Sequence, residues 1–267
     1  MLYWCSSISP MGINYFASAA SAERYKTGRP DFHANTIEHI RQYLRLKKPV
    51  GKALDVACGT GLSTKALLPV ADQVYGTDIS EEMLRLAGEQ DKIVYLHAQA
   101  EKLPFETGTF DLVTVCSGVH WFDVEAFLWE AYRVLKKGGW LVLYENFFKG
   151  EMVDVPAFAK WVSNVYLQRL PSPPRNKHYA WTAENLEPRG WRVEPMEQFT
   201  NEVSFTMDQQ IRYFTTQSNV VAVVESGRLT YEDIENWLVD ELTPFFGEEG
   251  ETQTVVYGNW IRYFQKK

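Results

Sequence analysis

Five short apolar segments, separated by stretches of helix length, dominate the chain between residues 50 and 146 and constrain its fold more than any other feature. They are Ala53–Ala57, Val74–Asp78, Ile93–His97, Phe110–Cys116 and Trp140–Tyr144. Strands that are apolar throughout, rather than alternating, are typical of a parallel sheet covered by helices on both faces. The sequence therefore predicts a doubly wound α/β core over residues 50–146.

The flanking segments predict how this core is completed. Apolar residues at helical spacing predict one helix before the core, over residues 32–44, and one inside it, which starts at Val124 and is ended by Gly138 and Gly139. After the core, the sequence pattern predicts strands over residues 198–206 and 254–264. It predicts mostly helices over residues 208–247. We therefore expect an N-terminal arm over 1–30, extended or loosely ordered in its first 22 residues, the core over 31–150, and the rest of the sheet over 151–267 with a helical cap at about 205–250.

The turn after the first predicted strand, Asp55–Gly61, carries the chemistry. Glycines there remove the Cβ atoms that would keep a ligand from the backbone, and ligands of open α/β sheets bind at the carboxyl ends of the strands. Asp78 ends the second strand, where a carboxylate can accept both hydroxyls of a ribose. Asp55 is electrostatically unsuited to the two phosphates of a dinucleotide and suits an ammonium or sulfonium group instead.

Five segments resemble, in order and spacing, the motifs of class I S-adenosylmethionine-dependent methyltransferases of the type 11 family. They are residues 55–61 (DVACGTG), 74–83 (VYGTDISEEM), 98–105 (AQAEKLPF), 110–113 (FDLV) and 133–139 (RVLKKGG). The segment 25–32 (YKTGRPDF) is similar to trans-aconitate methyltransferase-like members. The chain departs from the family pattern at Gln99, where Asp is frequent, and at Ala57, where the fuller motif has its first glycine.

The resemblance implies a Rossmann-like, seven-stranded, mostly parallel sheet with an antiparallel last strand and a helical cap. It also implies S-adenosyl-L-methionine as cofactor and S-adenosyl-L-homocysteine as product. The residues expected to bind the cofactor are Tyr25, Asp55, Ala57, Gly59, Gly61, Asp78, Ile79, Met83, Gln99, Ala100, Glu101, Cys116, Ser117 and Trp121.

His120 follows the fourth predicted strand and is the candidate general base, because an unperturbed imidazole can remove a proton near neutral pH. The alternative is that His120 and Trp121 only pack over the cofactor. We expect no metal, since His33 and His39 are six residues apart and no acidic cluster accompanies them.

The sequence thus predicts a methyltransferase that acts on a small molecule, with a carboxylate or hydroxyl acceptor. A non-catalytic S-adenosylmethionine-binding protein and an NAD-dependent oxidoreductase remain as alternatives. The formal charge of −7 and pI of 5.4 argue only weakly against a nucleic-acid partner, because nine acidic residues and one basic residue lie within residues 225–251. The absence of an amino-methyltransferase motif at Cys116–Val119 and of a long basic stripe argues against nucleic acid as a partner. Three cysteines are too few for a disulfide framework, and no apolar run reaches the ~20 residues of a membrane span, so we expect a cytoplasmic protein without a membrane partner.

Overall fold

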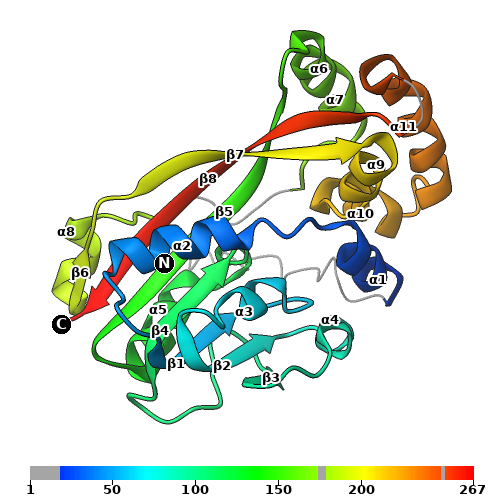
Figure 1. Ribbon diagram of the computed structural model, residues 1–267. Helices are drawn as coiled ribbons and strands as arrows, with labels where there is room; N and C mark the ends of the chain where they lie inside the picture. The colour runs from blue at the N-terminus through cyan, green and yellow to red at the C-terminus, as the bar shows by residue number, and fades with distance from the viewer. Residues whose placement is uncertain (1–18, 174–178, 248–249) are drawn as a thin grey trace, which may run out of the picture.

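The computed structural model describes residues 19–173, 179–247 and 250–267 of the chain, and its central feature is one twisted mixed sheet (Figure 1). The strand order is β3-β2-β1-β4-β5-β8-β6, and β7 pairs with β8 as well. The strands are β1 (Val50–Val56), β2 (Ala71–Asp78), β3 (Ile93–His97), β4 (Phe110–Cys116), β5 (Leu135–Met152), β6 (Trp191–Val193), β7 (Glu197–Thr206) and β8 (Thr252–Lys266). The sheet has eight strands, one more than predicted.

The first five strands are parallel, and β6, β7 and β8 are antiparallel to their neighbours, which confirms the predicted mixture. The extra strand arises because β8 is long enough to pair with two separate strands. Its last residues pair with β6, and the residues before them pair with β7.

Helices cover both faces of the parallel part. The helices of this part are α2 (His33–Tyr43), α3 (Leu62–Ala66), α4 (Glu81–Ala87), η1 (Val119–Trp121) and α5 (Val124–Val134). On one face Phe127 and Leu128 of α5 pack against Leu54 and Val113 of the sheet. On the other face Ile37 and Ile40 of α2 pack against strand residues that include Val142, so the core lies in two layers, as the apolar strands predict.

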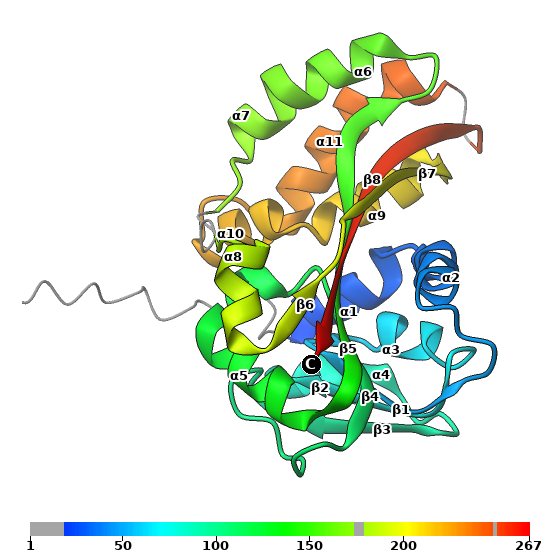
Figure 2. The ribbon, with the colours of Figure 1, turned by 90° about the vertical axis from the view of Figure 1, so that its left-hand side faces the viewer.

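The remaining helices form a lobe beyond the carboxyl ends of the parallel strands, at the upper right of Figure 1 and the top of Figure 2. The lobe contains α6 (Pro156–Trp161), η2 (Val162–Tyr166), α7 (Leu167–Arg169), α9 (Met207–Thr215), α10 (Ser218–Glu225) and α11 (Tyr231–Phe246). It has its own aromatic-rich core. The short α8 (Ala183–Leu186) and η3 (Glu187–Arg189) precede β6.

A ribbon of two long antiparallel strands connects the parallel sheet to this lobe (Figure 2). β5 and β8 pair from Trp140 with Gln265 to Met152 with Val255, with one irregularity after Phe148. The predicted fifth strand, Trp140–Tyr144, is thus only the part of β5 inside the parallel sheet. No helix in the described ranges is long and apolar enough to cross a membrane.

Two expectations about local structure are wrong. The described part of the N-terminal arm is not extended, because residues 19–28 form helix α1 (Ala19–Gly28). The helix that starts at Val124 ends at Val134 rather than at the glycines, because Leu135 already pairs with Phe110 of β4. Gly138, with a φ of 78°, instead lies in the irregular stretch before regular pairing resumes at Trp140.

Candidate active site

The turn between β1 and α3 contains two glycines, Gly59 and Gly61, that are required for different reasons. Gly59 has a φ of 54°, and a Cβ built on it would meet only the Tyr25 ring, 3.9 Å away. Gly61 has a φ of 81°, and a Cβ there would collide with the phenol of Tyr95. Gly59 therefore keeps the space above the turn open, whereas Gly61 allows the turn to pack on β3.

Asp78, at the end of β2, is fixed by the same turn. Its Oδ2 accepts a hydrogen bond from the Gly59 N–H at 2.8 Å, and its Oδ1 accepts one from the Ser80 N–H at 2.8 Å. Burial raises the pKa of the Asp78 carboxyl. Each carboxylate oxygen can accept more than one hydrogen bond, so Asp78 retains capacity for the two hydroxyls of a ribose.

Asp55 lies beneath the turn and does not border the cavity above it. It is fully buried, with Oδ2 accepting from Ser63 at 2.6 Å and Thr64 at 2.8 Å, and Oδ1 accepting from Thr114 at 3.0 Å. Burial raises its pKa to about 6, although these hydrogen bonds oppose the shift. The structure thus places Asp55 outside the lining of the cavity, whereas the sequence predicted contact with the cofactor.

Strained backbone marks the edge of the site. Ala57, just after β1, has a φ of 58°, and Ser117, just after β4, has a φ of 53°. Left-handed conformations of non-glycine residues are costly and tend to cluster at functional sites. No sequence pattern predicted this feature.

A cavity of about 400 Å³ lies above these strand ends, and we call it the cofactor cavity. This volume is in the range of small-molecule and cofactor sites. The predicted residues that line it are Tyr25, Ala57, Gly59, Asp78, Ile79, Met83, Gln99, Ala100, Glu101, Cys116, Ser117 and Trp121. Asp55, Gly61 and His120 are not among its lining residues.

Comparison with known proteins matches this site to one family. The family described as "Methyltransferase domain" matches residues 54–143, which include the turn, Asp78 and every lining residue of the cavity except Tyr25. The ubiquinone/menaquinone biosynthesis C-methyltransferase of Rhizobium johnstonii is 32% identical over 197 residues, which cover 68% of this chain and 73% of that protein. The chain belongs to the class I S-adenosylmethionine-dependent methyltransferases.

Two further similarities cover different shares of the chain. The demethylmenaquinone methyltransferase of Clavibacter sepedonicus is 41% identical over 100 residues, which cover 35% of this chain and 40% of that protein. The structure of a putative type II methyltransferase from Anaeromyxobacter dehalogenans has a TM-score of 0.66 at 23% identity, covering 84% of this chain and 94% of that one. The similarity of segment 25–32 to trans-aconitate methyltransferases stays a prediction.

The methyltransferase uses S-adenosylmethionine, and the cofactor cavity fits it. Gly59 leaves room for a ligand against the backbone, and the Asp78 carboxylate is fixed where a ribose can reach it. The lining combines these polar groups with apolar side chains such as Ile79, Met83 and Phe122, as cofactor sites generally do.

A smaller space, of about 50 Å³, adjoins this cavity, and we call it the recess. The two share the walls formed by Tyr25, Ala57, Gly59, Cys116 and Ser117. The other residues that line the recess are Arg29, Pro30, Phe32, His33, Cys58, Thr60, Leu62, Ser63 and Asn146.

Sequence reasoning missed His33 and Asn146 in this recess. Asn146 lies on β5, two residues past the end of the predicted strand, and the rule for strand ends could have found it. His33 is buried at the start of α2, with Nδ1 3.3 Å from the Tyr144 hydroxyl. Burial lowers the pKa of His33 to about 4.

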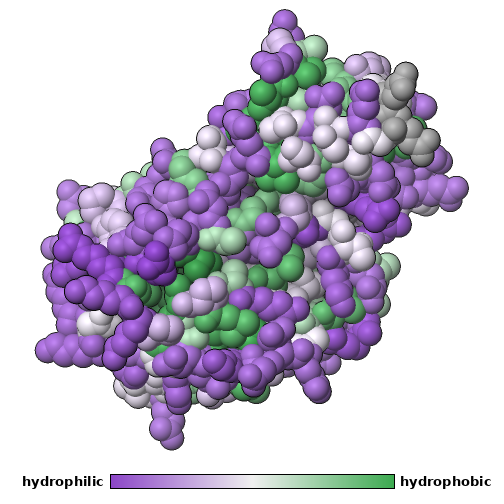
Figure 3. Space-filling view, viewed as in Figure 1, coloured by the Kyte–Doolittle hydropathy of each residue, from purple (hydrophilic) through white to green (hydrophobic). Residues whose placement is uncertain are grey.

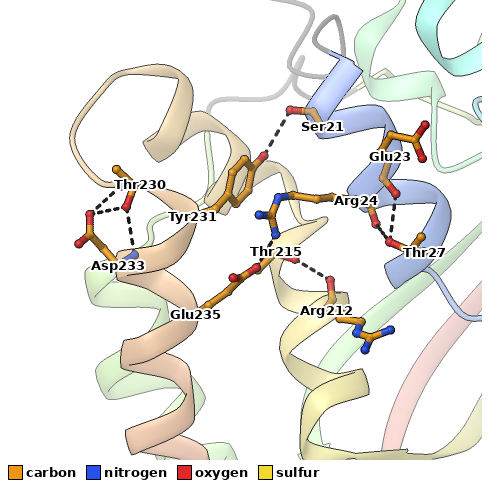
Figure 4. A network of polar contacts seen from close by, with 10 residues as sticks. All are labelled: Ser21, Glu23, Arg24, Thr27, Arg212, Thr215, Thr230, Tyr231, Asp233 and Glu235. Carbon is orange, nitrogen blue, oxygen red and sulfur yellow. Dashed lines mark hydrogen bonds and ion pairs between the residues drawn. The ribbon is translucent and has the colours of Figure 1, made fainter.

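Helix α1 holds the common wall of the two spaces in place, since Tyr25 belongs to it. Figure 4 shows α1 docked against the lobe, with Arg24 paired with Glu235 and its guanidinium 4.0 Å from the centre of the Tyr231 ring. At the other end of α1, Gly28 lies so close to the carbonyl of Arg212 on α9 that a Cβ would not fit. The lobe therefore supports the site through α1.

Proposed function

We propose that this methyltransferase transfers a methyl group to an oxygen atom of a small molecule, with a carboxylate favoured over a hydroxyl. Bound S-adenosylmethionine supplies an electrophilic methyl group on a sulfonium centre. The observation that carries the proposal is that the histidine, thiols and phenol among the described residues that line the two spaces are unsuited to remove a proton near neutral pH, while the two lining carboxylates, Asp78 and Glu101, already accept backbone N–H hydrogen bonds. An ionised carboxylate needs no base, because it already carries the attacking electron pair.

The candidate bases are each unsuited for a stated reason. His33 has a pKa of about 4 and is a weak base. Burial raises the pKa of the Cys116 thiol to about 12 and also raises that of Tyr25, so both keep their protons. Asp55 is enclosed by three hydroxyl donors, and His120 lies on η1, outside the lining of both spaces.

Steric access supports a small acceptor. The recess is narrow, and α1 with its neighbours covers it, since Tyr25, Arg29 and Phe32 belong to its walls. The role of these residues is to hold the acceptor oxygen against the cofactor cavity and to exclude water, which is the main protein contribution to such a displacement. We also propose that the helices within residues 205–250 act as the substrate cap and that nucleic acid is not a substrate.

Several relatives are named for C-methylation in quinone biosynthesis, so carbon is the competing acceptor atom. The chemistry of the product distinguishes the two. Methyl esters release methanol in mild base, whereas methyl ethers and C-methyl groups do not.

The test incubates the protein with methyl-labelled S-adenosylmethionine and a fractionated pool of small metabolites. We expect label in small molecules, and its release as volatile methanol on mild base treatment. Asp78→Ala should abolish the transfer at low cofactor concentration. Asp111→Ala is the matched control, because Asp111 lies on β4 at the opposite end of the sheet, bonded to Lys136. Products with C-methyl groups only, or no labelled small molecule, would contradict the proposal.

A further inference from the structure

Strand β7 forms a long border of the sheet that no other described strand covers. Within the described ranges it pairs with β8 alone, through ten consecutive residues without a shift of register. Figure 1 shows β7 along the upper margin of the ribbon. A strand edge of this length presents a row of N–H and C=O groups that can pair with a further strand.

The other border strands of the sheet are protected in ways that β7 is not. β3 has five residues and β6 has three, and Pro195 closely follows β6. β7 has ten residues (EQFTNEVSFT), and none of them is proline, glycine, lysine or arginine. Proteins usually prevent edge pairing with short strands, proline, bulges or lysine. The border at β7 is therefore open to pairing.

The side chains of β7 alternate between a covered face and an exposed face. On the covered face, the His39 ring of α2 stacks on Phe199 with their centres 4.0 Å apart. The Asn35 amide of α2 also donates to Asn201 Oδ1 at 2.6 Å. The exposed face consists of Gln198, Thr200, Glu202 and Ser204. Because a slip by one residue would exchange the two faces, a paired strand must keep exposed residues opposite exposed residues.

A second copy of β7 meets this requirement when the two strands run antiparallel about a twofold axis at Asn201. Thr200 of each copy then lies opposite Glu202 of the other, so a hydroxyl faces a carboxylate. On the covered face, Phe199 lies opposite Val203, so two apolar side chains meet. Such cross-strand pairs stabilise a sheet.

Neighbouring positions of the axis are less suitable. An axis at Glu202 would place two carboxylates directly opposite each other, which is destabilising. An axis at Thr200 would leave the last three residues of β7 without a partner in the second strand. Glu197, the other charged residue of β7, accepts a hydrogen bond from the Tyr263 hydroxyl and lies opposite Phe205 when the axis is at Asn201. No like charges are then directly opposite.

We propose that two copies of this protein form a symmetric dimer through β7, paired antiparallel about Asn201, so that their two sheets become one continuous sheet. Each copy contributes the same surface, as a twofold interface requires. The residues that line the cofactor cavity and the recess include none from β7, so the dimer does not rest on the proposed function.

Sedimentation velocity at low ionic strength, over a range of concentrations, measures the assembly. We expect a reversible equilibrium between monomer and dimer. Thr200→Glu places a carboxylate opposite Glu202 twice in each dimer and should raise the dissociation constant about fivefold. Thr200→Lys places an ammonium group at the same two positions and should lower it about threefold.

A charge exchange tests the register. Thr200→Glu combined with Glu202→Lys restores opposite charges across the axis and should return the dissociation constant to within about twofold of the wild type. Val94→Glu is the matched control, because Val94 is an exposed residue of the border strand β3, and it should leave the dimer unchanged. Unchanged affinity for S-adenosylhomocysteine shows that each variant is folded.

Three results would overturn the proposal. One is a wild-type protein that stays monomeric at the highest attainable concentration. Another is a dimer that both Thr200 variants leave unchanged or weaken alike, because neither outcome fits Glu202 opposite Thr200. The third is a dimer that Val94→Glu dissociates while the Thr200 variants do not, which would assign the interface to β3.

Discussion

The cofactor side of this site and the recess differ in how completely their polar groups are satisfied. On the cofactor side, Asp55 and Asp78 use both carboxylate oxygens in hydrogen bonds within the protein. In the recess, Arg29 and Asn146 leave buried donors unpaired. The first arrangement is rigid before any ligand binds, whereas the second keeps unused donors.

This difference indicates a division of labour between the two parts of the fold. The glycine turn and the strand ends are built from short-range contacts within one βαβ unit, which many methyltransferases can share. The recess adds to this turn residues of α1, of the segment from α1 to the start of α2, and of β5, which lie far apart in the sequence and meet only in the folded protein. In the view of Figure 3, hydrophilic residues cover most of the surface, and apolar residues appear in patches among them on both parts.

The largest effects are expected on the cofactor side, from replacing the two glycines of the turn, Gly59 and Gly61. Gly61→Ala should lower the free energy of unfolding by about 3 kcal/mol, because a strained φ and a collision with Tyr95 add together. Gly59→Ala should cost about 1 kcal/mol in stability, yet weaken S-adenosylhomocysteine binding at least tenfold, because its Cβ enters the cofactor cavity. Urea unfolding and calorimetric titration measure the two effects. Equal losses of stability would contradict the assignment.

Asp78→Ala tests the cofactor side through its affinity for S-adenosylhomocysteine. The variant loses the carboxylate that we assign to the ribose, and two hydrogen bonds to a charged group are worth about 1.5 kcal/mol each. We expect calorimetry to show an affinity for S-adenosylhomocysteine reduced about 100-fold, with Asp111→Ala unchanged. An affinity within threefold of the wild type would contradict the role of Asp78.

The buried His33 makes the stability of the folded protein depend on pH. The folded protein keeps His33 neutral down to a pKa of about 4, while the unfolded chain takes up the proton near pH 6.5, so stability is lost as the pH falls from 6.5 to 4. Asp55 acts in the opposite direction, because its folded pKa of about 6 exceeds the ordinary 3.8 and stability is gained as the pH falls from 6 to 3.8.

In the wild type these two effects partly cancel, so replacing His33 should reveal that of Asp55. We expect His33→Gln to be more stable at pH 5 than at pH 7, and to differ from the wild type in this pH dependence by on the order of 2 kcal/mol. Urea midpoints at the two pH values provide the measurement, with His97→Gln as the exposed control. A variant that keeps the wild-type profile would remove His33 from this account.

The smallest effect concerns the contact that docks α1 on the lobe. Arg24 and Glu235 are partly exposed, so their ion pair is discounted for solvent screening. A double-mutant cycle of Arg24→Ala and Glu235→Ala, followed by urea unfolding, should give a coupling energy of about 0.5 kcal/mol. Strictly additive losses would show that the ion pair in Figure 4 contributes nothing to docking.

Sequence reasoning reached the cofactor side because its signals are local. Apolar strands followed by glycine or aspartate predicted the parallel core, the cavity and most of its walls. Contact of Asp55 with the cofactor stays a prediction, and nothing in the motif shows that Ser63, Thr64 and Thr114 donate to both of its carboxylate oxygens. Sequence reasoning missed His33 and Asn146 in the recess, because these two residues are more than 100 positions apart in the sequence and meet only in the folded protein.

The long pairing of β5 with β8 has a consequence for how the molecule unfolds. Hydrogen bonds run along β5 and β8 from Trp140 to Phe148 without a break in register, so they pass from the parallel sheet into the lobe. The two parts thus share one cooperative unit, although each has its own apolar core. Amide hydrogens of Phe148 and Tyr257 should exchange with solvent as slowly as those of Val142 and Tyr263, in a single unfolding event.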